Sequence, residues 1–315
     1  MPRTGAMTAI LAAVLFGIST PLAKLLVHDL SPWMLAGLLY LGSGIGLGLV
    51  RLLTGSRKRG ERGLHGAEWL WLLAAVAAGG IAGPVLLMAG LTATPASTAS
   101  LLLNLEGVFT ALLAWFVFRE GVDRRLVAGM VAIVSGAAVL SWGGTVDIAG
   151  GWGPAAVAAA CLMWAVDNNL TRKVSLANPA DIATIKGLVA GSVNVGIALA
   201  LGDGLPAAPT AAAAMLVGLL GYGVSLVLFV VALRHIGAAR TGAYFSTAPF
   251  VGGIASLAIF GEPLTVGLAV AAALMGLGVW LHLTEDHDHE HDHDEMEHDH
   301  PHVHDEHHRH HHDGP

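Results

Sequence analysis

The chain has 315 residues, of which 54% are hydrophobic and 12% charged, with 41 glycines and a single cysteine. Apolar stretches this long with this much glycine exceed what a soluble core uses, so the composition predicts an integral membrane protein. One cysteine excludes a disulfide framework within the chain. The sequence contains no phosphate-binding loop, nucleophile elbow or basic nucleic-acid surface, so we expect neither an enzyme nor a nucleic-acid-binding protein.

Charge is distributed unevenly along the chain. Residues 285–315 hold 13 of the 17 histidines and 12 of the 23 acidic residues, whereas the part before them holds 15 of the 16 Lys and Arg residues. A mildly basic body is typical of proteins in the cytoplasmic membrane, whose inner loops face anionic lipid headgroups. We therefore expect a lipid-embedded body followed by a water-soluble tail.

Ten segments are long and apolar enough to cross the hydrocarbon core, which requires roughly 20 residues. The first is too long for the hydrophobic region of a signal peptide and is followed directly by a second, so it is interpreted as a retained helix. The ten spans are expected at about 6–27, 31–52, 69–91, 96–118, 124–142, 154–173, 179–201, 212–233, 241–260 and 264–283. Since the connections are short, consecutive helices should run antiparallel.

The basic residues outside the spans predict the orientation. With both termini on the same side, every Lys and Arg outside the spans falls on that side and the opposite loops hold none. Lys24 and Lys186 lie within spans. Lys and Arg stay on the cytoplasmic side, so we expect a multi-pass protein of the cytoplasmic (inner) membrane with both termini in the cytoplasm.

The two halves of the sequence are related. A shift of 148 residues aligns residues 16–24 with residues 164–172, and a shift of 147 aligns Pro32 with Pro179. A shift of 142 aligns residues 118–120 with residues 260–262, and each half then contains five spans. An odd number of spans forces the second copy to insert upside down relative to the first, as in the inverted repeats of many secondary transporters.

These features resemble the EamA repeats of the drug/metabolite transporter superfamily. The resemblance rests on the five-span halves, the aromatic–Gly/Ala pairs at 16–17 and 164–165, the proline before each second span, and the Glu that ends each fourth span. It covers residues 6–283 and implies a ten-helix secondary transporter with a central cavity, often an exporter of metabolites. The expected organisation is a first repeat at 1–143, a second repeat at 150–283 and a disordered cytoplasmic tail at 284–315.

Three ionisable side chains are expected at membrane depth, where charge is costly and usually functional. Glu106 follows Asn104 near the middle of the fourth span and could exchange a proton or bind a cation, the alternative being a structural, hydrogen-bonded Glu. Asp167 and Lys186 should both lie roughly 10 Å deep and could form an ion pair, acting either as a structural clamp or in substrate contact. Leu39 replaces in the first half the basic residue that Lys186 supplies in the second, so the site is not inferred by symmetry.

The other candidates are uncharged. Trp164 shares a helical face with Asp167, although packing against other helices is the simpler role for it. Asn168, Asn169, Ser19 and Thr20 could form hydrogen bonds with neighbouring helices instead of with a transported solute. The candidate transport path comprises Glu106, Asn104, Asp167, Asn168, Lys186, Trp164, Ser19 and Thr20. The candidate hinges are Pro21, Pro84 and Pro249, with ordinary kinks as the alternative.

The tail alternates imidazole and carboxylate groups, which suit zinc, nickel and cobalt. We expect several weak, interchangeable divalent-metal sites in a segment that is disordered without metal, because it has almost no apolar side chains. The candidate ligands are His287, His289, His291, His293, His298, His300, His302 and His304. The alternatives are a tail that only solubilises the C-terminus and one that senses pH.

The sequence thus favours a secondary active transporter, in the export direction, of a small metabolite or solute that passes through a central cavity by alternating access. It requires no cofactor, its partners are the lipid bilayer and a small-molecule substrate, and a homodimer is left open. One alternative is a transporter of divalent nickel, cobalt or zinc. The other is a membrane-tethered metal sensor or buffer that transports nothing.

Overall fold

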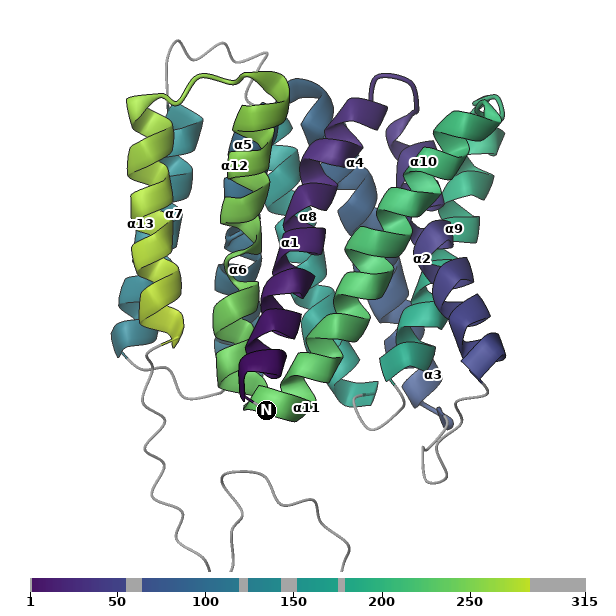
Figure 1. The fold of residues 1–315 in the computed structure, drawn as a ribbon, viewed down its shortest axis with the longest axis horizontal. Coiled ribbons are helices and arrows are strands. Elements are labelled where there is room, and N and C mark those ends of the chain that lie inside the picture. The colour runs from purple at the N-terminus through teal and green to yellow at the C-terminus, as the bar shows by residue number, and fades with distance from the viewer. Residues whose placement is uncertain (1, 55–63, 119–123, 143–151, 175–178, 284–315) are drawn as a thin grey trace, which may run out of the picture. The chain divides into compact units, whose positions relative to one another are not determined.

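A computed structural model of the protein describes residues 2–54, 64–118, 124–142, 152–174 and 179–283, and this part consists of helices and turns without a strand (Figure 1). The all-α membrane fold is therefore confirmed. The elements are α1 Pro2–Leu26, α2 Pro32–Thr54, α3 Glu68–Ala75, η1 Val76–Ala82, α4 Gly83–Ala93, α5 Ala96–Leu102, α6 Leu105–Phe118, α7 Arg124–Trp142, α8 Trp152–Thr171, η2 Arg172–Val174, α9 Pro179–Ala200, α10 Ala208–Gly218, η3 Leu219–Val224, α11 Ser225–Phe245, α12 Ala248–Phe260 and α13 Val266–Leu283.

Nine helical segments of the described part are long and apolar enough to cross a membrane. The expected sixth span forms helix α8 but is not among them. Its last turns carry Asp167, Asn168 and Asn169, which lower its mean hydropathy. The helix that falls short by composition therefore carries two polar residues of the candidate path, Asp167 and Asn168.

Two spans that the sequence predicts as continuous helices are broken at equivalent positions. The fourth span divides at Leu103–Asn104, between α5 and α6, and the Asn104 amide donates to Leu101 O at 2.8 Å. The ninth span divides at Ser246–Thr247, before α12, where both hydroxyls donate to carbonyls three residues earlier. Short polar side chains compete with the helix for backbone groups in this way, which explains both breaks.

The third span of each half contains a π-helical segment, η1 in the first and η3 in the second. Gly83 N–H donates to Ala78 O, and Ser225 N–H donates to Leu220 O, so both segments close with a bond to the fifth residue before. A shift of 142 residues aligns the two segments in the sequence. Such segments often occur at functional sites, and both contain buried glycines here.

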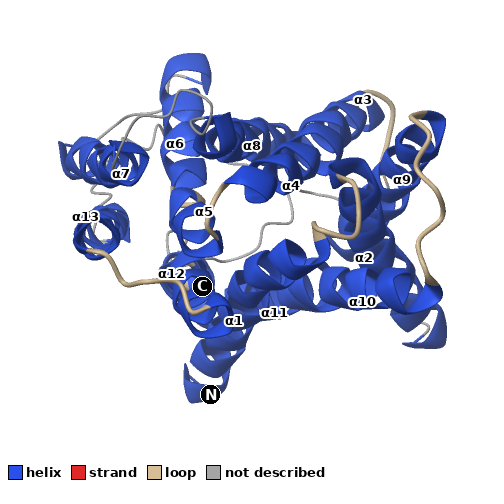
Figure 2. Cartoon of the chain, turned by 90° about the horizontal axis from the view of Figure 1, so that it is seen from above, coloured by secondary structure: helices blue, strands red, loops and turns tan. Residues whose placement is uncertain are grey.

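Equivalent helices of the two halves pack against each other in antiparallel pairs. In the α2–α9 pair, Gly37 lies against Val195 and Gly44 lies against Gly187, so the two helices run in opposite directions. In the α7–α13 pair, Gly129 lies against Gly278 and position 136 against Ala271. Figure 2 shows the α7–α13 pair beside α6 and α12. Antiparallel packing of equivalent helices demonstrates that the halves are inverted.

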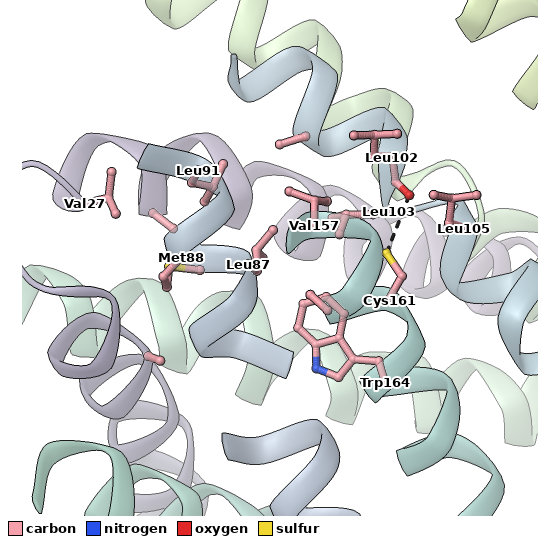
Figure 3. Packing of buried hydrophobic residues seen from close by; sticks show 14 of the residues in the cluster. Val27, Leu87, Met88, Leu91, Leu102, Leu103, Leu105, Val157, Cys161 and Trp164 are labelled. Atoms are coloured by element: carbon pink, nitrogen blue, oxygen red, sulfur yellow. Dashed lines mark hydrogen bonds between the residues drawn. The ribbon is translucent and has the colours of Figure 1, made fainter. Parts of the chain in front are cut away.

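A cluster of buried apolar side chains joins helices of both halves (Figure 3). Leu87 and Met88 of α4 and Val157 of α8 are buried there at no more than 1% exposure. Cys161 of the same helix donates its thiol to Leu102 O at 3.6 Å, next to the break between α5 and α6. This packing holds α8 against α4 and the broken fourth span, and so fixes the position of the polar residues at the end of α8.

Candidate functional site

A cavity of about 610 Å³ lies between the two halves. Both halves contribute to its wall, through α1, α2 and α6 from the first and α8, α9, η3 and α11 from the second. The lining residues are Phe16, Tyr40, Ser43, Glu106, Asn168, Thr171, Ile182, Ala183, Lys186, Gly187, Gly221, Tyr222, Ser225, Leu226, Phe229 and Phe245. Pockets for small molecules typically measure about 300–1,000 Å³, so the cavity can hold a small solute.

The cavity lies toward the end of the helix bundle where α8 ends and α9 begins. Thr171, the last residue of α8, and Ile182, in the first turn of α9, both line it. At the same end, an ion pair joins Arg51 of α2 to Asp181 of α9. We call this end of the bundle the cavity end and the other the far end.

Asp167 and Lys186 form the ion pair that their expected depths indicated. Lys186 Nζ donates to both carboxylate oxygens of Asp167, at 2.5 and 2.6 Å, and the two side chains are 17% and 8% exposed. Thr171 Oγ1 donates to Asp167 Oδ1 at 2.9 Å. The positive charge of Lys186 is thus compensated by the Asp167 carboxylate of the neighbouring helix α8.

The π-helical segment η1 makes room for this pair. A Cβ at Gly79 would overlap the Asp167 carboxylate, so only glycine fits there. The Gly79 carbonyl accepts hydrogen bonds from Tyr40 Oη at 2.7 Å and from Trp164 Nε1 at 2.9 Å. Pro84, five residues after Gly79, has no N–H to offer that carbonyl, and side chains of neighbouring helices replace the missing donor.

Glu106 belongs to the first turn of α6, directly after the break in the fourth span. Its Oε1 accepts a hydrogen bond from Asn168 Nδ2 at 2.8 Å, and the same amide lies 3.5 Å from Thr110 Oγ1. The backbone N–H groups that begin a helix favour a negative charge nearby. The break therefore explains how an acidic residue is accommodated at membrane depth, and it turns Glu106 toward α8 and the cavity.

Five of the aromatic side chains that line the cavity form a continuous series of ring contacts. Tyr40 packs on Tyr222 with ring centroids 5.7 Å apart, and Tyr222 packs edge-on against Phe16 at 6.0 Å. Phe16 continues to Phe245 at 5.4 Å, and Phe245 to Phe229 at 4.8 Å. We call these five side chains the aromatic wall.

Polar contacts close the far end. Lys24 of α1 donates to the carbonyl oxygens of Leu91 and Thr94, the latter at 3.0 Å. Glu262, just after α12, accepts the backbone N–H groups of Ala96 and Ser97 at 2.8 and 3.1 Å, and also the Ser97 hydroxyl. The Glu262 contacts join the end of α12 in the second half to α5 in the first, and the Lys24 contacts join α1 to the end of α4 within the first half. Parting the halves at the far end would therefore break the Glu262 contacts, and parting α1 from α4 would break those of Lys24.

The structure brings together four of the candidate path residues, namely Glu106, Asn168, Asp167 and Lys186. Glu106, Asn168 and Lys186 line the cavity, and Asp167 is bonded to Lys186 behind its wall, whereas the other four are not among the lining residues. Asn104 donates a hydrogen bond to Leu101 O at the break in the fourth span, and Trp164 donates to Gly79 O of η1. Ser19 donates to Phe16 O of its own helix at 2.6 Å, and Thr20 is buried at 3% exposure.

The candidate hinge prolines differ in their positions. Pro21 lies inside the unbroken α1, whereas Pro84 and Pro249 lie in the first turns of α4 and α12. The candidate histidines of the tail lie outside the described residues.

Sequence reasoning missed the aromatic wall and the far-end contacts. Tyr40 and Tyr222 are two of the three tyrosines in the chain, and a tyrosine within an apolar span is a signal that could have been followed. In the sequence, Lys24 stands out only as a charge within an apolar span. Its partners are backbone carbonyls, which leave no pattern in the sequence.

Both the sequence and the fold match known proteins. The profile of the EamA-like transporter family matches the chain twice, at residues 3–142 and 151–284. A protein of Methanothermobacter thermautotrophicus described as an uncharacterized transporter is 29% identical over 298 residues, covering 88% of this chain and 85% of that protein. A crystal structure superposes with a TM-score of 0.65 at 17% identity, covering 89% of this chain and 95% of the other, which supports the fold alone.

Proposed function

Since the chain belongs to the EamA-like transporter family, we propose that it is a secondary active transporter that exports a small metabolite or solute through the cavity between its halves. The observation that carries the proposal is a cavity lined by both inverted halves, with ionisable side chains inside it and polar contacts closing one end. In transporters built from inverted repeats, the substrate site lies at the interface of the repeats. The halves then rock about the site so that the cavity opens to either face in turn.

Glu106 is the group that we propose couples transport to protons. It lines the cavity and bonds a neutral amide, so a proton can be gained or lost without breaking an ion pair. Asp167 is held between Lys186 and Thr171 and is better suited to fixing the distance between α8 and α9. Exchange of a proton for solute at Glu106 would supply the driving force for export.

The distribution of Lys and Arg supports the orientation that we propose, with both termini cytoplasmic and the cavity end facing the cytoplasm. In this orientation the structure corresponds to an inward-facing state, ready to take up solute from the cell. The Lys24 and Glu262 contacts then form the closed outer side. The cytoplasmic (inner) membrane is the proposed location.

Metal as cargo has less support than an organic solute. Among the described residues, no group of three His, Cys, Asp or Glu side chains is placed to hold a metal ion. We retain the proposal that histidines 287–304 of the tail bind zinc, nickel or cobalt, as regulation or buffering on the cytoplasmic side. No cofactor is required for the transport cycle proposed.

The test is solute flux in proteoliposomes containing the full chain, across a panel of metabolites and with an imposed pH gradient. At least one solute should be taken up, and Glu106→Gln should reduce its pH-driven flux at least about tenfold, as expected when an interaction of about 1.4 kcal/mol or more is lost. Asp29→Asn removes a carboxylate from an exposed turn outside the cavity and should leave flux unchanged. Equal flux in wild type and Glu106→Gln would remove Glu106 from the mechanism.

A further inference from the structure

The charges that line the cavity do not cancel. Lys186 is bonded by both oxygens of Asp167 and lies 3.5 Å from Thr171 Oγ1, so this pair is neutral as a unit. Glu106 has the Asn168 amide as its hydrogen-bond partner, and within the described part of the chain no basic side chain forms an ion pair with it. With Glu106 ionised, the cavity therefore carries one uncompensated negative charge.

The remainder of the surface suits an apolar or aromatic group. The aromatic wall runs unbroken through five rings, from Tyr40 to Phe229, and all five line the same cavity as Glu106. Ring faces attract cations as well as apolar groups, and such contacts strengthen when water is excluded. A carboxylate and a wall of rings in one cavity match a solute that has a positive group and an apolar or aromatic body.

We propose that the cavity selects a monovalent organic cation with an apolar or aromatic body, whose positive group lies at Glu106 and whose body lies against the aromatic wall. The inference rests on the proposed transport function and names the substrate class of that same site. An anion would meet the Glu106 carboxylate, and among the described residues that line the cavity the basic side chain is Lys186, which Asp167 already holds. A zwitterion would need a cation for its carboxylate, and Lys186 is held by Asp167.

Three probes that share one phenyl ring and differ in charge test this selectivity. These are benzyltrimethylammonium, phenylalanine and benzenesulfonate, a cation, a zwitterion and an anion. Binding is measured by isothermal titration calorimetry on the full-length protein in dodecylmaltoside micelles, and uptake is measured in proteoliposomes. The cation should bind at least about tenfold more tightly than either other probe, since a close pair of opposite charges stabilises binding by at least that factor.

Variants separate the two parts of the site. Glu106→Gln should weaken binding of the cation about tenfold or more, whereas Glu106→Asp should retain most of it, and this conservative variant separates loss of charge from loss of folding. Phe245→Leu, which removes the ring in the middle of the Phe16–Phe245–Phe229 contacts, should weaken binding about threefold. Phe116→Leu is the matched control, because Phe116 is 70% exposed on α6 and lies outside the cavity.

The outcomes distinguish this proposal from the transport function. Tighter binding of benzenesulfonate or phenylalanine, undiminished cation binding by Glu106→Gln, or no binding of the cation would overturn the proposed selectivity. Uptake of phenylalanine or benzenesulfonate without uptake of the cation would do the same while supporting a transporter. Binding of the cation that depends on Glu106, without uptake, would support the site and contradict transport.

Discussion

Removing one partner of the Asp167–Lys186 ion pair should destabilise the protein more than removing both. Lys186 Nζ contacts both Asp167 oxygens at 2.5 and 2.6 Å, and the two side chains are 17% and 8% exposed. Loss of one partner leaves the other charge buried, which typically costs about 3–5 kcal/mol. Because Lys186 lines the cavity and water can reach the pair there, we expect the lower value, about 3 kcal/mol, for Lys186→Met.

The double variant Asp167→Asn/Lys186→Met removes both charges together. A buried ion pair exchanged for uncharged groups is often close to neutral, so we expect a loss of less than about 1 kcal/mol relative to wild type. The free energy of unfolding can be measured in mixed micelles of dodecylmaltoside and SDS, followed by tryptophan fluorescence. With a loss of about 3 kcal/mol for each single variant and less than about 1 kcal/mol for the double, the double-mutant cycle should then give an interaction energy of about 5 kcal/mol.

Asp29→Asn is the control for the cycle, because it removes one carboxylate from an exposed turn and should change stability by no more than about 0.5 kcal/mol. If the losses of the two single variants added up in the double variant, to within about 0.5 kcal/mol, the two residues would not be coupled. The account of Asp167 and Lys186 as one neutral unit, on which the charge of the cavity depends, would then be refuted.

Three further predictions concern the rest of the molecule. Gly79→Ala should lower the thermal unfolding midpoint, because the added Cβ would displace the Asp167 carboxylate. Gly107→Ala is the control and should leave the midpoint unchanged, because its added Cβ meets nothing within 4 Å. Equal midpoints for the two variants would contradict the tight fit at η1. Lys24→Met should speed the reaction of a Thr94→Cys probe with an impermeant maleimide added outside the cell, and an unchanged rate would show that Lys24 does not hold the far end closed. Deleting residues 285–315 should reduce the zinc bound per protein, measured by equilibrium dialysis, and leave solute flux intact; a parallel loss of flux would make the tail part of the transport path.

The fold could be predicted because its signals are local or periodic. Apolar length gives the spans, and an odd number of spans per repeat requires inversion, which the antiparallel α2–α9 and α7–α13 pairs display. The Asp167–Lys186 contact could also be predicted, because the rise per residue of a helix converts a position in the sequence into a depth in the membrane. The two residues have similar depths on consecutive helices, which was sufficient to predict that their side chains meet.

The remaining features depend on contacts between distant segments. The break that presents Glu106 results from Asn104 bonding its own backbone, and an asparagine in an apolar span could equally have bonded a neighbouring helix. The π-helical segment at Gly79 is stabilised by Tyr40 and Trp164 from two other helices. Such features arise from tertiary packing, so hydrophobic periodicity carries no sign of them.

The most direct test of the central claim is the accessibility of Ser43, which lines the cavity, from the two faces of the membrane. Ser43→Cys is introduced in a Cys161→Ala background, which removes the native cysteine. An impermeant maleimide is then applied to inside-out or right-side-out vesicles. Alternating access predicts fast labelling from the cytoplasmic face, and slower labelling from the opposite face that accelerates when Lys24→Met is added. Labelling from one face alone, unchanged by Lys24→Met, would contradict the account and indicate a membrane protein that binds solute without transporting it.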